Sequence, residues 1–385
     1  MTEPSAEPEV EELPVDQAWL GRVLSESVGA PGGSLVETTC IPISKGKGFM
    51  SFVYKVMLTW DQNSKDFEKL PKSVVIKLPT ATKISEISEE MAKLMNQEMV
   101  KRAHNREIYA YRLLNSHGPP PIKMPKFFYG EEISDDKNGI LILEDLSENS
   151  VSIKFGDVYS DGQVAAVVET IASLQAFSLL HTEWEGKLEH IMGDQDLKQS
   201  LEIWDTKAEK TFQEFPQIKM TRERYEKLSE YAKSKVDQFC GKSPDRCVIS
   251  LGDLQPNNML WRTKEGTKIA TDEIRAVLDF QIMSRGSLYQ DLAYLLFFYQ
   301  SAESRRQNTD KILNQYYKSL SDKIAPKKPP YSLAEVRKGY DDLFAVFTVS
   351  QFCSIDMFKN IGVTDEQMPA LIDRLNAAIE DCVIE

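Results

Sequence analysis

Apolar positions repeat with two different periods along the chain, and the period changes near residue 150. Before that point, runs of β-branched and aromatic residues bounded by glycine or proline predict short strands. These runs cover residues 36–41, 52–58, 73–78, 126–129 and 139–143. A helix is predicted over residues 15–27, and a second helical region, in two pieces, over residues 85–116. The first part of the chain should therefore be rich in strands.

After residue 150 the spacing of the apolar residues becomes that of helices. The predicted helices cover residues 161–181, 197–213, 221–239, 288–300, 303–323, 333–357 and 365–381. Three short strand-like pieces lie between them, at residues 248–250, 259–262 and 274–279. The pattern predicts an α+β chain in two lobes, with a small β-rich N-lobe over residues 13–144 and a large helical C-lobe over residues 145–385. Residues 1–12, rich in Glu, Pro and Ala, should form a disordered acidic tail.

Composition and charge exclude several classes of protein. With 385 residues the chain is too long for one compact core, which agrees with two lobes. Its 46 Lys and Arg against 59 Asp and Glu leave a net charge of −13, whereas a general nucleic-acid binder needs a basic surface. The longest apolar run, Leu292–Tyr299, is far shorter than the ~20 residues that span a bilayer. The acidic N-terminus does not resemble a secretory signal, and the five scattered cysteines form no C-x-x-C pair. We expect a cytoplasmic protein that binds neither nucleic acid nor membrane.

The strongest chemical pattern is the segment Leu251–Leu260, LGDLQPNNML, which separates two of the short predicted strands. Asp253 and Asn258 are five residues apart on this loop, so a carboxylate and an amide can face one cavity. Asp279, at the end of the strand predicted over residues 274–279, adds a second carboxylate. Phosphoryl transfer uses this set, with one Asp to accept the hydroxyl proton and an Asn and an Asp to hold Mg²⁺. Taken alone, the loop is equally consistent with an ordinary polar turn.

A second pair of charges is predicted in the N-lobe. Lys77 lies inside the apolar strand 73–78, where a lysine is either at a sheet edge with its ammonium in water or paired with an acid. Glu107 falls on the apolar stripe of the second helical region, together with Ala103 and Tyr111. An unpaired charge on such a stripe is costly. A Lys77–Glu107 ion pair is the interpretation that satisfies both residues.

Two weaker features accompany these residues. Gly46 and Gly48 form a turn between the first two strands, and with Ser51 they offer backbone N–H groups to phosphates, although glycine hairpin turns are common. Glu144 follows the strand 139–143 at the lobe junction, where its backbone would be available to an adenine edge. The order of all these elements is that of protein kinases, but the H-R-D, D-F-G and A-P-E signatures are absent.

The sequence resembles the ecdysteroid kinase-like, or CHK kinase-like, family, whose relatives include choline kinases and aminoglycoside phosphotransferases. The resemblance rests on Gly46–Lys55, Val74–Pro79, Arg106–Tyr111, Leu141–Ser147, Gly252–Trp261 and Val277–Leu296. The last two segments, GDLQPNNMLW and VLDFQIMSRGSLYQDLAYLL, are the most specific together. The resemblance implies a protein-kinase-like fold, with an N-lobe that binds nucleotide and a C-lobe that carries the catalytic loop, the metal and the substrate site.

By position, the resemblance implies that Asp253 is the catalytic base and that Asn258 and Asp279 hold Mg²⁺. Lys77 would bind the α- and β-phosphates of ATP, and Glu107 would anchor Lys77. Asp291, in the D-L-A motif, is expected to brace the catalytic loop from the start of a helix. The implied activity is transfer of the γ-phosphoryl group of ATP to a hydroxyl of a small, apolar alcohol such as an ecdysteroid. The sequence carries no sign of the oligomeric state.

Two positions depart from the family pattern. The His that precedes Gly-Asp in the family is Leu251 here, and a second family His, on a helix, is Gln175. Leu251 cannot make the hydrogen bond by which a His would brace the loop. A weak or dead pseudokinase that binds nucleotide or a lipophilic ligand therefore stays open beside an active kinase. A choline- or aminoglycoside-type kinase with a cationic substrate is a separate alternative.

Overall fold

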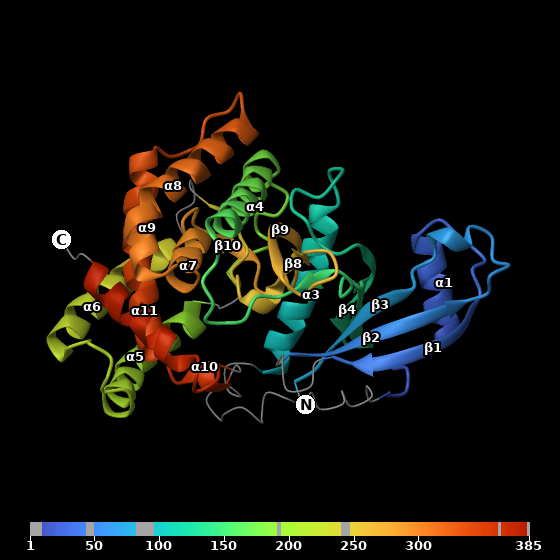
Figure 1. The fold of residues 1–385 in the computed structure, drawn as a ribbon, viewed down its shortest axis with the longest axis horizontal. Coiled ribbons are helices and arrows are strands. Elements are labelled where there is room, and N and C mark those ends of the chain that lie inside the picture. The colour runs from blue at the N-terminus through green and yellow to red at the C-terminus, as the bar shows by residue number, and fades with distance from the viewer. Residues whose placement is uncertain are drawn as a thin grey trace. The chain divides into compact units, whose positions relative to one another are not determined.

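The structure is a computed structural model, and it describes residues 10–43, 50–81, 96–190, 194–239, 247–360 and 363–382. The chain divides into two compact units (Figure 1). Unit 1 consists of Met1–Arg112 and Pro125–Glu148, and unit 2 consists of Leu113–Met124 and Asn149–Glu385. Unit 1 is built around a sheet and unit 2 is largely helical, so the α+β, two-lobed fold class is confirmed.

Unit 1 contains one antiparallel sheet of five strands in the order β1-β2-β3-β5-β4. The strands are β1 (Leu35–Pro42), β2 (Ser51–Trp60), β3 (Ser73–Pro79), β4 (Phe127–Ser134) and β5 (Lys137–Glu144). All five runs of β-branched and aromatic residues therefore form strands as predicted, and a 3₁₀ turn, η1 (Phe67–Lys69), lies between β2 and β3. Because β3 is bonded to β2 on one side and to β5 on the other, Lys77 lies on a central strand and not at an edge.

Alternate residues of β3 point to opposite faces of the sheet, because the side-chain period of a strand is two. Val74 and Ile76 are fully buried on one face and belong to the core cluster that Leu20 and Leu24 of helix α1 (Gln17–Ser27) complete. Burying an aliphatic side chain of this size contributes about 1.5–3 kcal/mol. This face therefore stabilises unit 1 through apolar packing.

Lys77 lies on the opposite face of the sheet, where it contacts helix α3 (Gln97–Leu114). Ala103, Glu107 and Tyr111 are spaced four residues apart on this helix, and all three are buried, as the apolar stripe predicts. The first piece of the helical region predicted over residues 85–116 falls mostly outside the described residues. Helix α3 thus carries one acidic residue against the sheet together with apolar ones.

Unit 2 contains all seven helices that the apolar spacing predicts, with shifts of a few residues at their ends. They are α4 (Asp161–Leu180), α5 (Asp194–Glu214), α6 (Arg222–Phe239), α7 (Gln290–Phe298), α8 (Ala302–Ile324), α9 (Leu333–Cys353) and α11 (Met368–Asp381). A short helix, α10 (Met357–Asn360), continues the region after α9. Two small antiparallel sheets accompany the helices: β6-β8-β9 and β10-β7. Their strands are β6 (Ser150–Val151), β7 (Val248–Ser250), β8 (Met259–Thr263), β9 (Ala270–Val277) and β10 (Ser284–Gly286).

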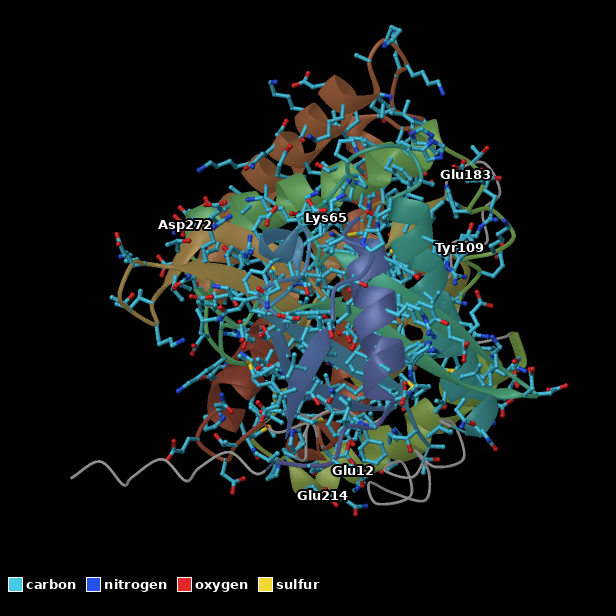
Figure 2. The ribbon with its side chains drawn as sticks, turned by 90° about the vertical axis from the view of Figure 1, so that its right-hand side faces the viewer. Glu12, Lys65, Tyr109, Glu183, Glu214 and Asp272 are labelled. Atoms are coloured by element: carbon cyan, nitrogen blue, oxygen red, sulfur yellow. The ribbon has the colours of Figure 1, made fainter. Side chains whose placement is uncertain are left out.

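Helix α4 is the core helix of unit 2. Its length and composition alone would allow it to cross a membrane, but 61% of its most apolar window is buried inside the protein. It packs against α8, β7 and β9, and Val167, Ile171 and Leu174 are fully buried. Charged residues such as Glu183, Glu214 and Asp272 are exposed on the surface of the unit (Figure 2). The apolar character of α4 is therefore explained by its burial.

Candidate active site

The loop formed by residues 251–258 is anchored at both ends by short strands of unit 2. Strand β7, which precedes it, pairs with β10, and β8, which follows it, pairs with β6 and β9. A 3₁₀ turn, η3 (Pro256–Asn258), closes the loop. The phenol of Tyr299, which directly follows α7, donates a hydrogen bond to the carbonyl of Leu254 at 2.7 Å. The loop therefore has a defined conformation despite its irregular backbone.

Asp253 and Asn258 meet inside this loop. The amide nitrogen Nδ2 of Asn258 donates to Oδ2 of Asp253 at 3.0 Å, and Oδ1 of Asp253 accepts from the N–H of Gln255 at 3.3 Å. Both Asp253 and Asn258 are partly buried. Because Nδ2 of Asn258 is directed at Asp253, its remaining polar atom is an oxygen of the kind that Mg²⁺ binds. The loop thus brings the carboxylate and the amide together, as their spacing predicts.

A buried carboxylate from the next helix holds the start of the loop. Oδ1 of Asp291 accepts from the hydroxyl of Ser250 at 2.7 Å and from the N–H of Gly252 at 3.1 Å. Oδ2 accepts from the N–H of Leu251 at 2.9 Å, and the whole residue is 1% exposed. Burial raises the pKa of the Asp291 carboxyl, while the three bonds that it accepts act in the opposite direction. The expectation that Asp291 braces the loop is confirmed.

Gly252 allows the chain to turn into the loop. Its φ angle is +75°, which residues with a Cβ atom rarely adopt. A Cβ atom built here would lie 2.9 Å from the carbonyl oxygen of Ile282, too close for an ordinary contact. Glycine at this position therefore lets the backbone of the segment after β9 approach the loop.

Asp279 does not end a strand, which corrects the prediction from the sequence. Strand β9 ends at Val277, and Asp279 follows two residues later with a left-handed φ of +60°. The apolar run continues to Leu278, whose N–H donates to the carbonyl of Asn258 at 2.8 Å, but the backbone leaves the extended conformation at Asp279. Asp279 is the residue after Leu278, so the Leu278–Asn258 bond holds it close to Asn258. Backbone strain of this kind costs about 1–3 kcal/mol and collects at functional sites.

In unit 1, Nζ of Lys77 lies 2.7 Å from Oε2 of Glu107. The side chain of Glu107 is 1% exposed and that of Lys77 is 11% exposed, so the charges meet away from bulk water. The ion pair predicted from the strand and helix patterns is confirmed. A buried pair of this kind depends on both partners, because removing one leaves an uncompensated charge.

His104 lies one turn before Glu107 on α3, and the sequence pattern did not single it out. It is 1% exposed, and its Nε2 atom lies 2.9 Å from the carbonyl oxygen of Glu131. Burial lowers the pKa of His104 to about 4; the bond to Glu131 opposes this and the charge of Lys77 adds to it. The imidazole is therefore neutral near pH 7 and adds no positive charge beside Lys77.

The other candidates of unit 1 are placed as follows. Gly46 and Gly48 lie outside the described residues. Ser51 begins β2 and is 5% exposed, and its hydroxyl has no hydrogen-bond partner among the described residues. The backbone N–H of Glu144 donates to the carbonyl of Lys126 at 2.9 Å. The sheet therefore already uses this N–H group of the residue expected to offer its backbone to adenine.

Asp145, directly after Glu144, forms a network of hydrogen bonds and an ion pair that the sequence pattern did not reveal. Its carboxylate accepts from the hydroxyl of Ser73 at 2.7 Å, from the N–H of Ser147 at 2.9 Å, and lies 2.9 Å from Nζ of Lys55. Burial alone would raise the pKa of Asp145, but Lys55, Ser147 and Ser73 outweigh it and lower the pKa to about 2. The only sign of this network in the sequence is an acidic pair at a strand end.

The two positions that depart from the family pattern are both built into the core of unit 2. Leu251 is 2% exposed, and its backbone rather than its side chain bonds Asp291. Gln175 is fully buried on α4, where Nε2 donates to the carbonyl of Leu288 at 3.1 Å and Oε1 accepts from the phenol of Tyr316. Leu251 has no polar side-chain atom, and both polar side-chain atoms of Gln175 have partners. Neither departure therefore introduces an unpaired polar group into the core.

A cavity of about 510 Å³ lies on α5 and α6 of unit 2. Its polar and aromatic lining includes Asp205, Glu209, Phe212, Tyr225, Glu226 and Glu230. Arg222 and Lys233, which also line it, form ion pairs with Glu209 and Asp205. Glu226 and Glu230 add acidic charge beyond these two pairs. None of the three candidate residues Asp253, Asn258 and Asp279 lines this cavity.

Comparison with known proteins gives one family and two relatives from Caenorhabditis elegans. The DUF1679 family, described as "Uncharacterized oxidoreductase dhs-27", matches residues 35–382. The uncharacterized kinase-like protein D1044.1 is 22% identical over 325 residues, with 83% of each chain covered. The uncharacterized oxidoreductase dhs-27 is 23% identical over 318 residues, which make up 76% of this chain but 36% of dhs-27. The oxidoreductase in that name thus describes a protein most of whose length lies outside the match.

Among solved structures, a candidate aminoglycoside phosphotransferase from Ralstonia eutropha is similar to this chain. The likeness covers 95% of this chain and 97% of the other, with a TM-score of 0.51 and 11% sequence identity. At such low identity the likeness concerns the fold alone. It confirms the protein-kinase-like fold that the order of the sequence elements predicts.

Proposed function

We propose that this chain, which belongs to the DUF1679 family, is an ATP-dependent kinase that phosphorylates a hydroxyl of a small molecule. The observation that carries the proposal is the Asp253–Asn258 pair, with 3.0 Å between the amide nitrogen and the carboxylate, on a loop that Asp291 braces. In a protein-kinase-like fold, a carboxylate and an amide at this spacing supply the base and a metal ligand of phosphoryl transfer.

In this proposal Asp253 orients the substrate hydroxyl and accepts its proton. The side-chain oxygens of Asn258 and Asp279 would hold Mg²⁺, which neutralises charge on the transferred phosphoryl group when it is bound. Oxygen donors of this kind suit Mg²⁺ better than they suit a soft metal. The left-handed backbone at Asp279, beside the Asn258 carbonyl, supports a metal-binding role, since such strain is retained where a side chain must be aimed.

In unit 1 the proposal assigns the α- and β-phosphates of ATP to Lys77. Glu107 fixes the ammonium group at 2.7 Å, and the sheet fixes the strand that carries it on both sides. His104 is neutral near pH 7, so the positive charge that this pair of residues offers to phosphate is that of Lys77. A phosphate ligand is attracted to such a fixed, partly desolvated cation.

The backbone brace by Asp291 favours an active kinase over a pseudokinase, although Leu251 replaces the family His. Asp291 braces the loop through the backbone N–H groups of Leu251 and Gly252, so no side chain is needed at position 251. Gln175, the other departure, is fully bonded within the core. The order of the loop, which catalysis requires, thus has a source independent of the missing histidine.

We propose a small alcohol of the ecdysteroid type as the first substrate class to test, because the sequence resembles the ecdysteroid kinase-like family. We also propose that the reaction takes place in the cytosol. A choline- or aminoglycoside-type substrate is the second candidate. A cationic substrate would need acidic or aromatic walls close to Asp253, and the lining of the cavity on α5 and α6 does not include Asp253.

The test is ADP formation by the full-length protein with ATP and Mg²⁺, over a panel of ecdysteroids, other steroid alcohols, choline and aminoglycosides. Turnover should require one acceptor class. Asp253→Ala should lower turnover by about 10²–10⁴-fold, the usual contribution of a general base. ATP binding by this variant, followed through thermal stabilisation, should stay near that of the wild type.

Adjacent asparagines provide a matched control. Asn258 bonds Asp253, whereas Asn257 is exposed. Asn258→Ala should therefore reduce Mg²⁺-dependent turnover, and Asn257→Ala should leave it nearly unchanged. Wild-type turnover in Asp253→Ala would overturn the assignment of the base. ATP binding without ADP formation on any acceptor would instead support the pseudokinase alternative.

A further inference from the structure

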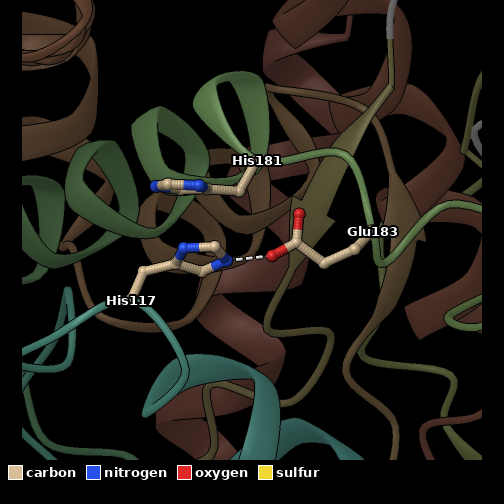
Figure 3. A group of neighbouring side chains, drawn as sticks. All are labelled: His117, His181 and Glu183. Carbon is tan, nitrogen blue, oxygen red and sulfur yellow. Dashed lines mark hydrogen bonds and ion pairs between the residues drawn. The ribbon is translucent and has the colours of Figure 1, made fainter.

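Two histidines and a glutamate from separate segments of unit 2 converge at one point outside the residues considered so far (Figure 3). His117 lies in the 113–124 segment, just beyond the end of α3, His181 directly follows α4, and Glu183 comes two residues later. One ligand atom from each side chain lies within 4.8 Å of the other two. The protein has only four histidines, so the meeting of two of them is unusual for its composition.

The side chains are arranged closely around this point. The imidazole rings of His117 and His181 stack with centroids 3.8 Å apart and an angle of 25° between their planes. Figure 3 shows the carboxylate of Glu183 directed at the His117 ring, where Oε1 bonds Nε2. Phe177 contacts both rings, with centroid distances of 4.8 Å to His181 and 5.8 Å to His117. The cluster therefore has an apolar wall on one side.

The backbone beside His181 and Glu183 is well anchored. The N–H of His181 donates to the carbonyl of Phe177 at 3.0 Å, which closes the end of α4. Trp184, next to Glu183, is 2% exposed and donates Nε1 to the carbonyl of Ser178 at 3.0 Å. The side chains of His117 and Glu183 are 37% and 43% exposed. A small ion in solution can thus reach the cluster, and the backbone beside His181 and Glu183 is held in place.

An ion pair alone does not account for the cluster. A His117–Glu183 pair explains one imidazole, and such surface pairs contribute little to stability. The second imidazole, stacked on the first, would be repelled if both rings were protonated. Two neutral imidazoles beside an ionised carboxylate are the protonation states in which these groups bind metal.

We propose that His117, His181 and Glu183 form a binding site for a divalent transition-metal cation such as Zn²⁺. Two imidazole nitrogens and a carboxylate oxygen suit Zn²⁺, Co²⁺ or Ni²⁺, whereas Mg²⁺ and Ca²⁺ prefer ligand sets made only of oxygens. Three protein ligands leave a fourth position for water, which the exposure of the site permits. On binding, His117 exchanges its bond to Glu183 for the metal. The ion would tie the 113–124 segment to the end of α4.

The test titrates Zn²⁺ into the full-length protein by calorimetry, after removal of metal with a chelator and in the presence of excess Mg²⁺. We expect binding of one Zn²⁺ per chain at this site, and visible absorption of a four- or five-coordinate complex when Co²⁺ replaces Zn²⁺. His117→Ala and His181→Ala should each weaken Zn²⁺ binding by more than about 100-fold, because changes to outer-shell partners alone cost about 10–100-fold.

His190→Ala is the matched control, because it removes a histidine of the same region that is not one of the three ligands. It should bind Zn²⁺ like the wild type. Glu183→Gln, an exposed change that keeps the side-chain shape, should weaken binding and provides a second variant if a histidine variant fails to fold. Zn²⁺ binding of equal strength in the wild type, His181→Ala and Glu183→Gln would overturn the proposal. So would the absence of Zn²⁺ binding by the wild type.

Discussion

The candidate residues of the two units are held in place by different kinds of bonds. In unit 1, Lys77 and Glu107 are held side chain to side chain, between a strand and a helix. In unit 2, Asp291 holds the loop that carries Asp253 largely through backbone N–H groups. A backbone bond does not depend on the side chain at that position, whereas an ion pair needs both residue types. We therefore expect unit 2 to tolerate a change at Leu251 and unit 1 to tolerate no single change at Lys77 or Glu107.

The largest effect should come from breaking the ion pair of unit 1. Glu107→Ala removes the carboxylate that lies 2.7 Å from the buried ammonium group of Lys77. The free energy of unfolding should fall by about 3–5 kcal/mol, the usual cost of breaking a buried pair. Urea unfolding, with hydrogen exchange of the β3 amides to localise the change, measures this loss.

A double variant separates stability from function in this pair. Lys77→Met combined with Glu107→Leu replaces both charges with apolar groups of similar size, which recovers most of the lost stability. It should still fail to bind ATP normally, because the positive charge is gone. A double variant as unstable as Glu107→Ala would show that the ion pair is not the source of the loss.

The next largest effect is expected in unit 2, at the brace of the loop. Asp291→Ala leaves the hydroxyl of Ser250 and the N–H of Leu251 without the acceptor that Asp291 supplies, while the N–H of Gly252 keeps the hydroxyl oxygen of Ser250 at 3.2 Å. Since one buried unsatisfied group costs about 1–3 kcal/mol, the free energy of unfolding should fall by about 3 kcal/mol. Kinase turnover should fall as well, because the loop loses its order. Denaturant unfolding and ADP formation measure the two effects.

Leu251→Met is the matched control for this brace. It changes the neighbouring side chain while the backbone bond to Asp291 remains. A volume-conserving exchange of this kind costs less than about 1.5 kcal/mol, and turnover should stay within a few fold of the wild type. Equal losses in Asp291→Ala and Leu251→Met would contradict the view that backbone bonds hold the loop.

The smallest effect is a pH dependence in unit 1. The pKa of His104 is lowered from 6.5 to about 4, so between these pH values the unfolded chain binds a proton that the folded chain does not. The contribution of neutral His104 to the free energy of unfolding is therefore complete above pH 6.5 and declines as the pH falls toward 4. Between pH 7 and pH 5 the loss should be about 2 kcal/mol. Urea unfolding of the wild type and of His104→Gln at both pH values measures it; the same pH dependence in both proteins would contradict this origin.

The sequence contained most of the information on local structure. The strands of unit 1 and the helices of unit 2 follow from the period of apolar residues, because each element buries one face and so repeats its apolar positions at its own period. The same reasoning paired Lys77 with Glu107, since a charge on a buried strand and a charge on a buried stripe need each other. Asp253 and Asn258 are only five residues apart on one loop, so their spacing in the sequence was enough to predict that they lie close together.

Only the tertiary structure decided where distant segments meet. No local pattern records the left-handed backbone of Asp279 just beyond β9, or the bond from the N–H of Leu278 to the carbonyl of Asn258. The burial of His104 depends on packing of α3 against the sheet, and the His117–His181–Glu183 cluster depends on a segment after α3 reaching the end of α4. Periodicity reports which face of an element is buried, but not which element covers it. The sequence therefore determined the elements and the nearby pairs, and packing decided the contacts among remote residues.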